Sequence, residues 1–325
     1  MSLSLVKVNS IFFSPGLCLF SRGPGWCVML LALSAFLVGC QPQDEAPPPV
    51  YLALPDLSME TDYSREGTAS DAFTTAWVLY QQEVIGIYEL PAVLPVALGA
   101  GPHKLTVLPA MNLNGISGLR TIYSPVNPIE LSLTITEEDF LDTLTFSARE
   151  RSTTYQSFYE VELIENFDQA GLNFQKLNNS DTTLERIKNP DSTFSYTPPY
   201  ASQPENNGQA GLIALRPENR RGEFSSISTY SLPRGLQNLF VELNYRTNIP
   251  FSIGLVAITP DGERRQITVT LNPKEEWSKL YLDLITEYNA FPNASGYKLY
   301  VRSQLPTNKA AGRIYLDNLK LVYSP

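Results

Sequence analysis

The chain has 325 residues, of which 43% are apolar and 18% charged, as expected for a globular protein long enough for two domains of common size. Its 24 Lys and Arg against 33 Asp and Glu give a net charge of -9, which argues against nucleic acid as a partner. All three cysteines, Cys18, Cys27 and Cys40, lie in the first 40 residues, and His103 is the only histidine, so the rest of the chain excludes a disulfide framework, a Cys or His-rich metal site and a thiol nucleophile.

The N-terminal segment has the parts of a secretion signal in the expected order. Residues 29–38, MLLALSAFLV, form an apolar run that follows two positively charged residues and is too short to span a bilayer. The run ends in LVGC at 37–40, which resembles the lipobox of bacterial lipoproteins, where the peptidase cuts before a cysteine whose thiol carries a diacylglycerol. The resemblance implies a signal peptide at 1–39 and lipidation of Cys40, often with palmitate; an ordinary secretion signal is the alternative.

Residues 40–57 are predicted to form a tether. Their prolines cannot enter a sheet interior and favour extended conformations. The letters CQPQDE at 40–45 are similar to the Gln-plus-acidic signal that sends some Bacteroidota lipoproteins to the cell surface, although a generic polar tether would look the same. We therefore expect a Bacteroidota-type envelope lipoprotein, anchored by lipid to the outer membrane at the cell surface or on its periplasmic face.

From about Phe73 onward, apolar residues alternate with polar ones in short runs separated by Pro, Gly, Asn and Asp. This period of two is typical of half-buried strands. The clearest runs are at 129–135, 239–245, 251–255 and 267–271, while TTLERIK at 182–188 is the best candidate for one or two turns of helix. The patterns predict an all-β protein with two β-sandwich domains in tandem, divided near residue 158.

The first half, 58–158, is predicted to be the smaller sandwich. Its segment 76–116 resembles the PEGA-like and carboxypeptidase-regulatory-like modules, which serve mostly as spacers or interaction modules on envelope proteins. The resemblance implies a return strand that begins with a Gly-His-Lys-hydrophobic pattern, and the letters GAGPHK at 99–104 predict that His103 lies in the turn leading into it. The residues that carry the resemblance are Gly86, Pro91, Pro95, Gly101, His103 and Lys104.

The second half, 159–325, resembles jelly-roll domains of the galactose-binding-like or carbohydrate-binding-module kind. The fold hosts binding, adhesion and plain structural roles, so it does not specify a function. The segments that carry the resemblance are ENFD at 165–168, GLIAL at 211–215, WSKLYLDL at 277–284 and IYLDNLKL at 314–321.

The last run contains a register break, because its apolar residues change parity between Leu316 and Leu319. A β-bulge at Asp317-Asn318 would reconcile the two parts. In related jelly rolls an acidic residue here often joins acidic groups of the opening strand around a structural calcium, whose preferred ligands are oxygens. The resemblance therefore implies a calcium held by Glu165, Asp168 and Asp317; the alternative is that Asp317 caps a turn and the opening acids are solvated. No other cofactor is expected.

Aromatic side chains are the candidates for a sugar platform, because pyranose rings stack their C–H faces on aromatic rings. Tyr196, Tyr200 and Tyr230 lie in or near a Pro- and Asn-rich excursion at 189–209 and are the predicted ligand-binding residues. Trp277 opens an alternating strand and is expected to pack in the core. The alternative is that these tyrosines are ordinary sandwich residues.

Catalysis is not predicted. A catalytic histidine needs an orienting acid and a nucleophile, and nothing near His103 reads as a nucleophile elbow. The acidic run Glu137, Glu138, Asp139 and Asp142 follows a strand and is expected to be solvated. We predict a non-enzymatic lipoprotein whose jelly roll binds a glycan or a protein partner. A structural or assembly subunit of an outer-membrane complex is the alternative, and a glycan hydrolase is the third possibility.

Overall fold

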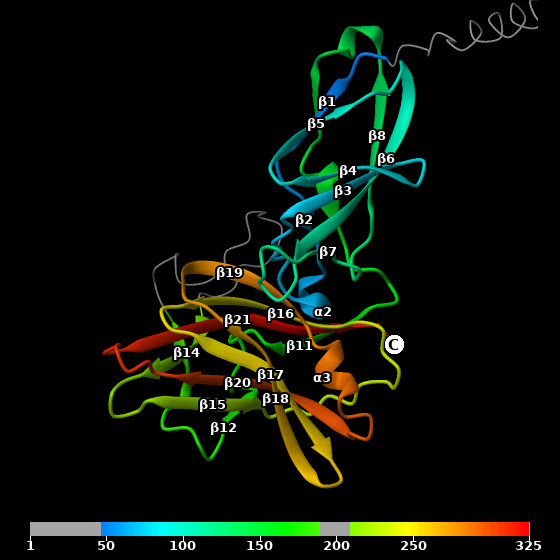
Figure 1. Cartoon of the computed structure of the whole chain (residues 1–325). Helices are drawn as coiled ribbons and strands as arrows, with labels where there is room; N and C mark the ends of the chain where they lie inside the picture. The colour runs from blue at the N-terminus through cyan, green and yellow to red at the C-terminus, as the bar shows by residue number, and fades with distance from the viewer. Residues whose placement is uncertain (1–46, 189–208, 325) are drawn as a thin grey trace, which may run out of the picture. The chain divides into compact units, whose positions relative to one another are not determined.

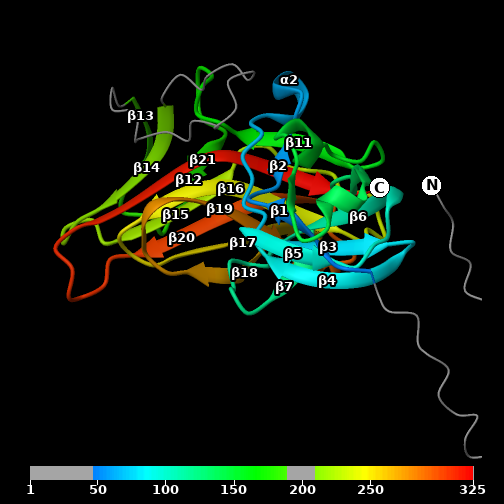
Figure 2. The same cartoon turned by 90° about the horizontal axis from the view of Figure 1, so that it is seen from above.

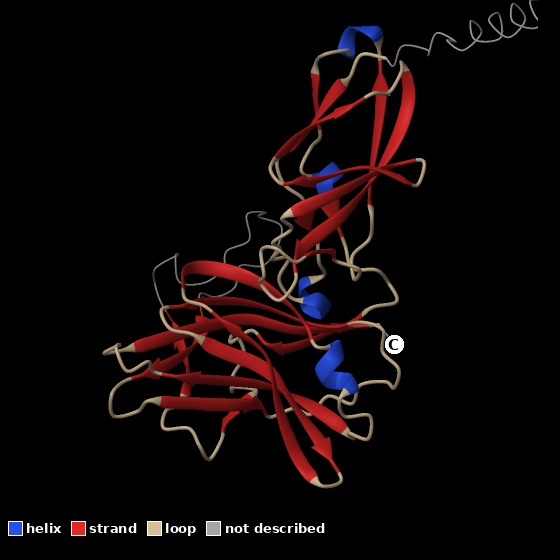
Figure 3. Ribbon diagram, viewed as in Figure 1, coloured by secondary structure: helices blue, strands red, loops and turns tan. Residues whose placement is uncertain are grey.

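Strands account for almost all the regular structure of the residues that the structure describes (Figure 3). The computed structural model describes residues 47–188 and 209–324. Within these residues, no helix is long and apolar enough to cross a membrane. The predicted signal peptide, Cys40, Tyr196 and Tyr200 lie outside the described residues, and their roles stay predictions. The prediction of an all-β chain with sandwich sheets in tandem is confirmed.

The first half forms three sheets, of three, two and five strands (Figure 1). Their strand orders are β5-β1-β9, β10-β2 and β4-β3-β6-β7, with β8 also paired to β6. The strands are β1 (Val50–Leu54), β2 (Ser58–Met59), β3 (Thr75–Tyr80), β4 (Glu83–Glu89), β5 (Ala92–Val96), β6 (Gly101–Asn112), β7 (Arg120–Ile122), β8 (Ile129–Ile135), β9 (Thr143–Thr145) and β10 (Ser152–Thr153). The short helices are α2 (Tyr63–Glu66), η1 (Glu137–Asp139) and η2 (Arg149–Arg151).

Strand β8 shows why the alternating pattern predicted these sheets. Every second residue of β8 is buried, from Ile129 to Ile135, and the residues between them are exposed. His103 differs from its predicted turn position, because β6 begins at Gly101 and takes the histidine into the ladder opposite Leu133. The ring is half-buried, with Nδ1 3.1 Å from the Tyr80 hydroxyl and Nε2 2.7 Å from the Gly99 carbonyl, so His103 has a structural place in the strand.

The second half forms two sheets, of six and five strands. The six-stranded sheet has the order β13-β14-β21-β16-β19, with β11 paired to β21, and the five-stranded sheet has the order β12-β15-β20-β17-β18. The elements are β11 (Glu160–Glu165), β12 (Phe174–Lys176), β13 (Leu184–Lys188), β14 (Gln209–Leu215), β15 (Arg221–Ser226), β16 (Leu239–Thr247), β17 (Phe251–Thr259), β18 (Gly262–Leu271), β19 (Lys274–Asp283), α3 (Ile285–Asn289), β20 (Gly296–Gln304) and β21 (Gly312–Tyr323).

Two local predictions in this half are wrong. Residues 184–188 form strand β13 instead of a helical turn, because five consecutive residues pair antiparallel with β14 in the sheet and tertiary pairing overrides a weak local preference. In β18, Ile267 does not share a face with Val269 and Leu271. A bulge pairs Ile267 with Gly254 but Val269 with Ile253, and Ile267 is left 40% exposed.

The predicted bulge in the last strand is confirmed. Glu242 pairs with Lys320 but Asn244 pairs with Asp317, so β21 has one residue more than β16 between these pairs. Asn318 sits in the bulge with a φ of 52°, a left-handed conformation that asparagine tolerates better than most residues. The bulge turns both Asp317 and Asn318 into buried positions.

The chain from Pro48 onward forms one compact unit that contains two hydrophobic clusters. One cluster runs from Val50 to Tyr159, and the other from Ile164 to Leu321. The first cluster also includes three residues of the second half, Phe240, Tyr281 and Val322, which come from β16, β19 and β21. These three strands lie side by side in both views (Figures 1 and 2), so one face of the six-stranded sheet packs against the first half. The division near residue 158 stays a prediction.

Candidate functional site

A groove of about 600 Å³ lies between helix α2 and the loop that follows β11. We call it the α2 groove. Its walls combine amide and hydroxyl side chains with apolar ones, and residues of both halves of the chain contribute to it. The lining residues are Tyr63, Ser64, Leu163, Ile164, Glu165, Asn166, Gln169, Ala170, Gly171, Leu172, Asn173, Ile227 and Ser228.

Helix α2 is one turn long and is fixed at both ends. The Asp62 carboxylate accepts the Ser64 backbone N–H at 3.1 Å, and the Glu66 carboxylate accepts the Asp62 backbone N–H at 2.8 Å, which is a reciprocal N-terminal cap. Gly67 ends the turn with a φ of 68°. The helix therefore holds Tyr63 in a fixed position at the wall of the α2 groove.

Tyr63 is half-buried and donates its hydroxyl hydrogen to Oδ2 of Asp168, 3.1 Å away. Burial, followed by the negative charge of Asp168, raises the pKa of Tyr63 to about 12. The hydroxyl therefore stays protonated at neutral pH and keeps the α2 turn attached to the loop after β11.

That loop is shaped by Glu165. Its Oε1 accepts the backbone N–H of Phe167 at 2.7 Å, and its Oε2 accepts the backbone N–H of Asn173 at 2.6 Å. Asn173 in turn donates to the Ile164 carbonyl at 2.9 Å and to the Tyr230 hydroxyl at 3.0 Å. One buried carboxylate thus closes the loop across eight residues, so the opposite wall of the groove has a defined backbone.

The predicted calcium ligands lie near one another but are not arranged as a metal site. Asp317 is fully buried, and burial, together with the charges of Asp168 and Glu165, raises its pKa well above the ordinary value. Both oxygens of Glu165 are already used for backbone N–H groups. In the described residues no group of three or more His, Cys, Asp or Glu side chains could hold a metal ion. The residues as placed do not fit a calcium site, and the assignment stays a prediction.

The aromatic candidates are placed differently from expectation. Tyr230 is 5% exposed in the second cluster and pairs through its backbone with Tyr297, so its ring offers no face to a sugar. Trp277 is half-buried and lies on the outer face of β19, with its ring centroid 6.4 Å from that of Tyr315. Trp277 is on the same face of β19 as Lys279, whereas Leu280 and Leu282 on the other face point into the sandwich core. The prediction that Trp277 packs in the core is therefore wrong.

The acidic run after β8 caps a turn. The Asp139 carboxylate accepts the Thr136 backbone N–H and hydroxyl, each at 2.7 Å, and these hydrogen bonds lower the pKa of Asp139. Glu137 and Glu138 are exposed on the same turn. The Asp139 carboxylate therefore has a structural role in this exposed turn.

A cluster of arginines lies on the outer face of the five-stranded sheet. We define the arginine face as Arg221 and Glu223 of β15, Arg265 of β18, and Tyr300 and Arg302 of β20. Glu223 is 1% exposed and forms ion pairs with all three arginines. The Arg221 Nε donates to Glu223 Oε1 at 2.7 Å, and the Arg265 guanidinium lies 5.9 Å from the centre of the Tyr300 ring. The three arginine side chains are 36–40% exposed.

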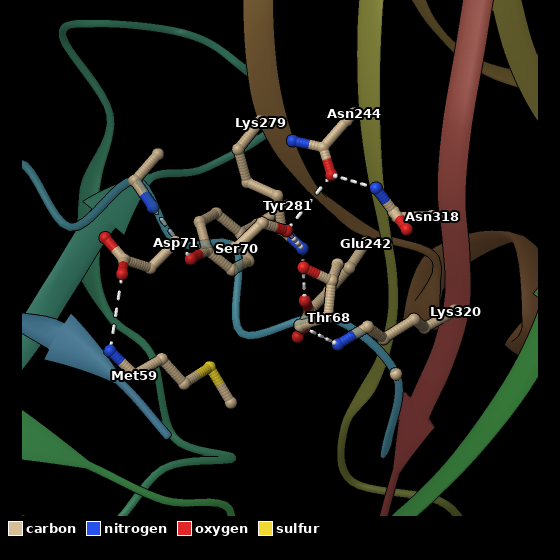
Figure 4. Close-up of polar contacts among 12 residues, drawn as sticks. Met59, Thr68, Ser70, Asp71, Glu242, Asn244, Lys279, Tyr281, Asn318 and Lys320 are labelled. Carbon is tan, nitrogen blue, oxygen red and sulfur yellow. Dashed lines mark hydrogen bonds and ion pairs between the residues drawn. The ribbon is translucent and has the colours of Figure 1, made fainter. Parts of the chain in front are cut away.

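A second charged cluster is sealed between the two halves, and we call it the Glu242 network (Figure 4). Glu242 Oε2 lies 2.6 Å from the Lys279 ammonium, while Oε1 accepts the hydroxyls of Tyr123 at 2.5 Å and Tyr155 at 2.6 Å. The Lys279 and Glu242 side chains are 1% and 0% exposed. Lys320 donates to the Thr68 carbonyl at 2.5 Å. The cluster therefore joins residues of the first half to three strands of the second.

Hydrogen bonds extend the Glu242 network across the junction. Lys279 donates to the Ser70 hydroxyl at 3.0 Å, and this hydroxyl donates to the Asn244 side-chain oxygen at 3.0 Å. Asn318, in the β21 bulge, donates to the same oxygen at 3.3 Å (Figure 4). The sequence does not reveal this network, because Glu242 and Asn244 occupy the polar positions of an alternating strand, and such positions normally face solvent. The signal in the sequence is that charged residues at 242, 279 and 320 interrupt three otherwise apolar strand segments.

No protein-family model matches this sequence, and no curated protein matches it. The solved structures to which the chain is similar include carbohydrate-binding modules of family 29. A variant of such a module, solved with mannohexaose, has 15% identity and a TM-score of 0.32 over 50% of this chain and 92% of its own. A family 29 module has 15% identity and a TM-score of 0.32 over 50% of this chain and 88% of its own. At this identity and score the likeness does not specify a ligand.

Proposed function

We propose that the protein is a non-catalytic, lipid-anchored binding protein that takes a glycan in the α2 groove. The observation that carries the proposal is the lining of this groove. The Asn166 and Gln169 amides and the Ser228 hydroxyl can exchange hydrogen bonds with sugar hydroxyls, while Tyr63 and Leu163 present apolar surface for the C–H faces of a sugar ring. Because Glu165 and the α2 cap fix the two walls, little conformational entropy is lost on binding.

The groove proposal is tested with Tyr63→Ala. A panel of soluble neutral polysaccharides, namely a mannan, a β-glucan and a xylan, is run in affinity electrophoresis against the full chain. We expect retardation by at least one polysaccharide and a loss of about tenfold in affinity for the variant, since a stacking ring contributes roughly 1–1.5 kcal/mol. Tyr88→Ala, which removes a half-buried tyrosine from strand β4, is the matched control. The absence of binding to every polysaccharide, or equal losses in both variants, would contradict the proposal.

The anchor is proposed from the sequence alone. The run at 29–38 followed by LVGC supports cleavage before Cys40 and lipidation of its thiol. Two or more acyl chains, at roughly 0.8 kcal/mol for each buried methylene, would hold the protein at a membrane. Cys40→Ser is expected to abolish palmitate labelling and to release the protein into the soluble fraction. Labelling that persists in the variant would rule out Cys40 as the attachment site.

A structural or assembly role is the second candidate, and strand β4 favours it. This strand lies at the edge of its sheet and exposes Val84, Ile85 and Ile87 by 51%, 41% and 51%. Exposed apolar side chains on an edge strand are suited to protein contact. Extraction in mild detergent separates the two candidates. A stoichiometric membrane protein that is lost with Ile87→Lys supports assembly, whereas a monomer that retains polysaccharide affinity supports the binding function.

A further inference from the structure

The arginine face has the composition of an anion-binding surface. Three guanidinium groups converge on one carboxylate, with the Arg265 and Arg302 nitrogens 3.4 and 3.6 Å from Glu223 oxygens and Arg221 in closer contact. Glu223 can offset only one of the three positive charges. A further carboxylate, Asp181, lies at the edge of the cluster, where it accepts the Arg221 backbone N–H at 3.1 Å. The surface therefore carries an excess of positive charge on a chain whose net charge is -9.

The guanidinium groups are held in place before any ligand arrives. Glu223 lies opposite Arg302 across the β15-β20 pair, and its side chain is only 2% exposed, so its position is fixed by the sheet. Arg265 reaches across β17 and places its guanidinium carbon 5.9 Å from the centre of the Tyr300 ring on β20. Stacking and ion pairing restrict rotamers that an isolated surface arginine would sample freely. Glu223 and Tyr300 thus act as positioning residues.

The arginines keep donors for a ligand. A guanidinium has five N–H donors in a planar fork, and the contacts with Glu223 use only part of them. The side chains remain 36–40% exposed, so the unused N–H groups reach solvent. Forked donors of this kind match the paired oxygens of a carboxylate or a sulfate.

We propose that the arginine face binds the carboxylate or sulfate groups of an acidic polysaccharide. A polymer is favoured over a small anion because the arginines come from three strands of one open sheet face, and a chain can place successive charged groups along it. The same face presents the hydroxyl pair of Ser252 and Thr270, 2.8 Å apart, which can hydrogen-bond uncharged sugar positions. The net negative charge of the rest of the chain disfavours a densely charged nucleic acid. The inference is independent of the α2 groove, because the two surfaces share no residue.

The test compares polygalacturonate and dextran sulfate with uncharged dextran as probes in affinity electrophoresis of the full chain. We expect binding to at least one acidic polymer, none to dextran, and weakening with added NaCl. Arg265→Gln/Arg302→Gln should weaken the binding about tenfold or more, since two charge-assisted contacts are lost. Arg302→Lys keeps the charge but loses the fork, so a smaller loss is expected. The control is Arg120→Gln/Arg149→Gln, which removes the same charge from the first half.

Several outcomes overturn the inference. They are no binding to either acidic polymer, equal losses in the control and the test variant, or tighter binding to double-stranded DNA than to both polymers. A circular-dichroism melt of each variant identifies any loss caused by unfolding, and Arg302→Lys serves if the double variant melts early. Failure here is distinguishable from failure of the groove proposal, because Tyr63→Ala should leave polygalacturonate binding unchanged and the arginine variants should leave neutral polysaccharide binding unchanged.

Discussion

Two buried glutamates, one on each sheet of the second half, differ in whether their cationic partners are buried or exposed. Glu242 of the six-stranded sheet is 0% exposed and is covered by lysine, tyrosine and the first half of the chain. Glu223 of the five-stranded sheet is 1% exposed, but its three arginine partners reach solvent. The same residue type therefore stabilises a junction in one sheet and organises an open charged surface in the other. The difference lies in whether the cations can be hydrated.

The largest expected effect is a difference between the two glutamates in how much each stabilises the fold. Glu242→Ala leaves the Lys279 ammonium buried without its carboxylate, and we expect a loss of about 3–5 kcal/mol in the free energy of unfolding. Glu223→Ala should cost roughly 1 kcal/mol, because its half-exposed arginines can turn into water. Urea denaturation of both variants measures the difference.

The double variant Glu242→Leu/Lys279→Met tests whether the loss in Glu242→Ala comes from the unpaired lysine. It replaces the buried pair by apolar side chains of similar volume and should recover much of the loss. Equal losses for Glu242→Ala and Glu223→Ala would show that burial of the cations does not distinguish the two clusters.

The second effect concerns pH. Burial lowers the pKa of Lys320 to about 7 from an ordinary value of 10.5. Between pH 7 and 10.5 the unfolded chain therefore binds a proton that the folded chain has released, so the free energy of unfolding should rise with pH over this interval and level off below pH 7. Lys320→Met should flatten this rise in urea denaturation series, whereas Lys298→Met, which removes a lysine paired with the exposed Glu263, should leave it intact. A rise that persists in Lys320→Met would assign it to another group.

Low pH should weaken the Glu242 network through protonation of Glu242. Lys279 and Lys320 hold the pKa of Glu242 at about 2, below its ordinary value of 4.5, in spite of the burial that acts against them. The contribution of Glu242 to stability is complete above pH 4.5 and is lost as pH falls toward 2. Acid unfolding of Glu242→Gln should therefore be less steep than that of the wild-type chain over this range.

The smallest expected effect is that of salt. Half-exposed guanidinium groups are screened by ions, while a sealed pair is not. Adding 0.5 M NaCl, about five times the ionic strength at which the Debye length is roughly 10 Å, should reduce the cost of Glu223→Ala by a few tenths of a kcal/mol. The cost of Glu242→Ala should not change. A salt-sensitive Glu242→Ala would mean that water reaches the network.

The fold class and the closing bulge followed from residue patterns, because both depend on local alternation. Ile129 to Ile135 and the parity change after Leu316 were readable without tertiary information. The β13 strand was not, since only its pairing with β14 decides its conformation. Alternation also predicts which residues of a strand point away from the sandwich core, but it does not show whether that second face is exposed. Glu242 and Asn244 therefore look like surface residues in the sequence, although the first half of the chain covers them.

The candidate sites were less predictable than the fold. The arginine face brings together side chains at 221, 265 and 302, whose proximity depends on the strand order β15-β20-β17-β18. Tyr63 was never a candidate, because the groove it lines is completed by a loop more than a hundred residues away. Tyr230 was chosen for its neighbours in sequence, whereas its contact with Asn173 places it inside the sandwich.

The contacts of Tyr281 couple the unfolding of the two halves of the chain. Its hydroxyl accepts the Ala72 backbone N–H at 3.1 Å, its carbonyl accepts the Asn114 backbone N–H at 3.0 Å, and its ring lies in the first hydrophobic cluster although β19 belongs to the second half. Neither half can then lose its structure without exposing apolar surface of the other. The polypeptide from Pro48 onward should melt in a single transition, and a fragment ending near residue 158 would lack part of its own interior.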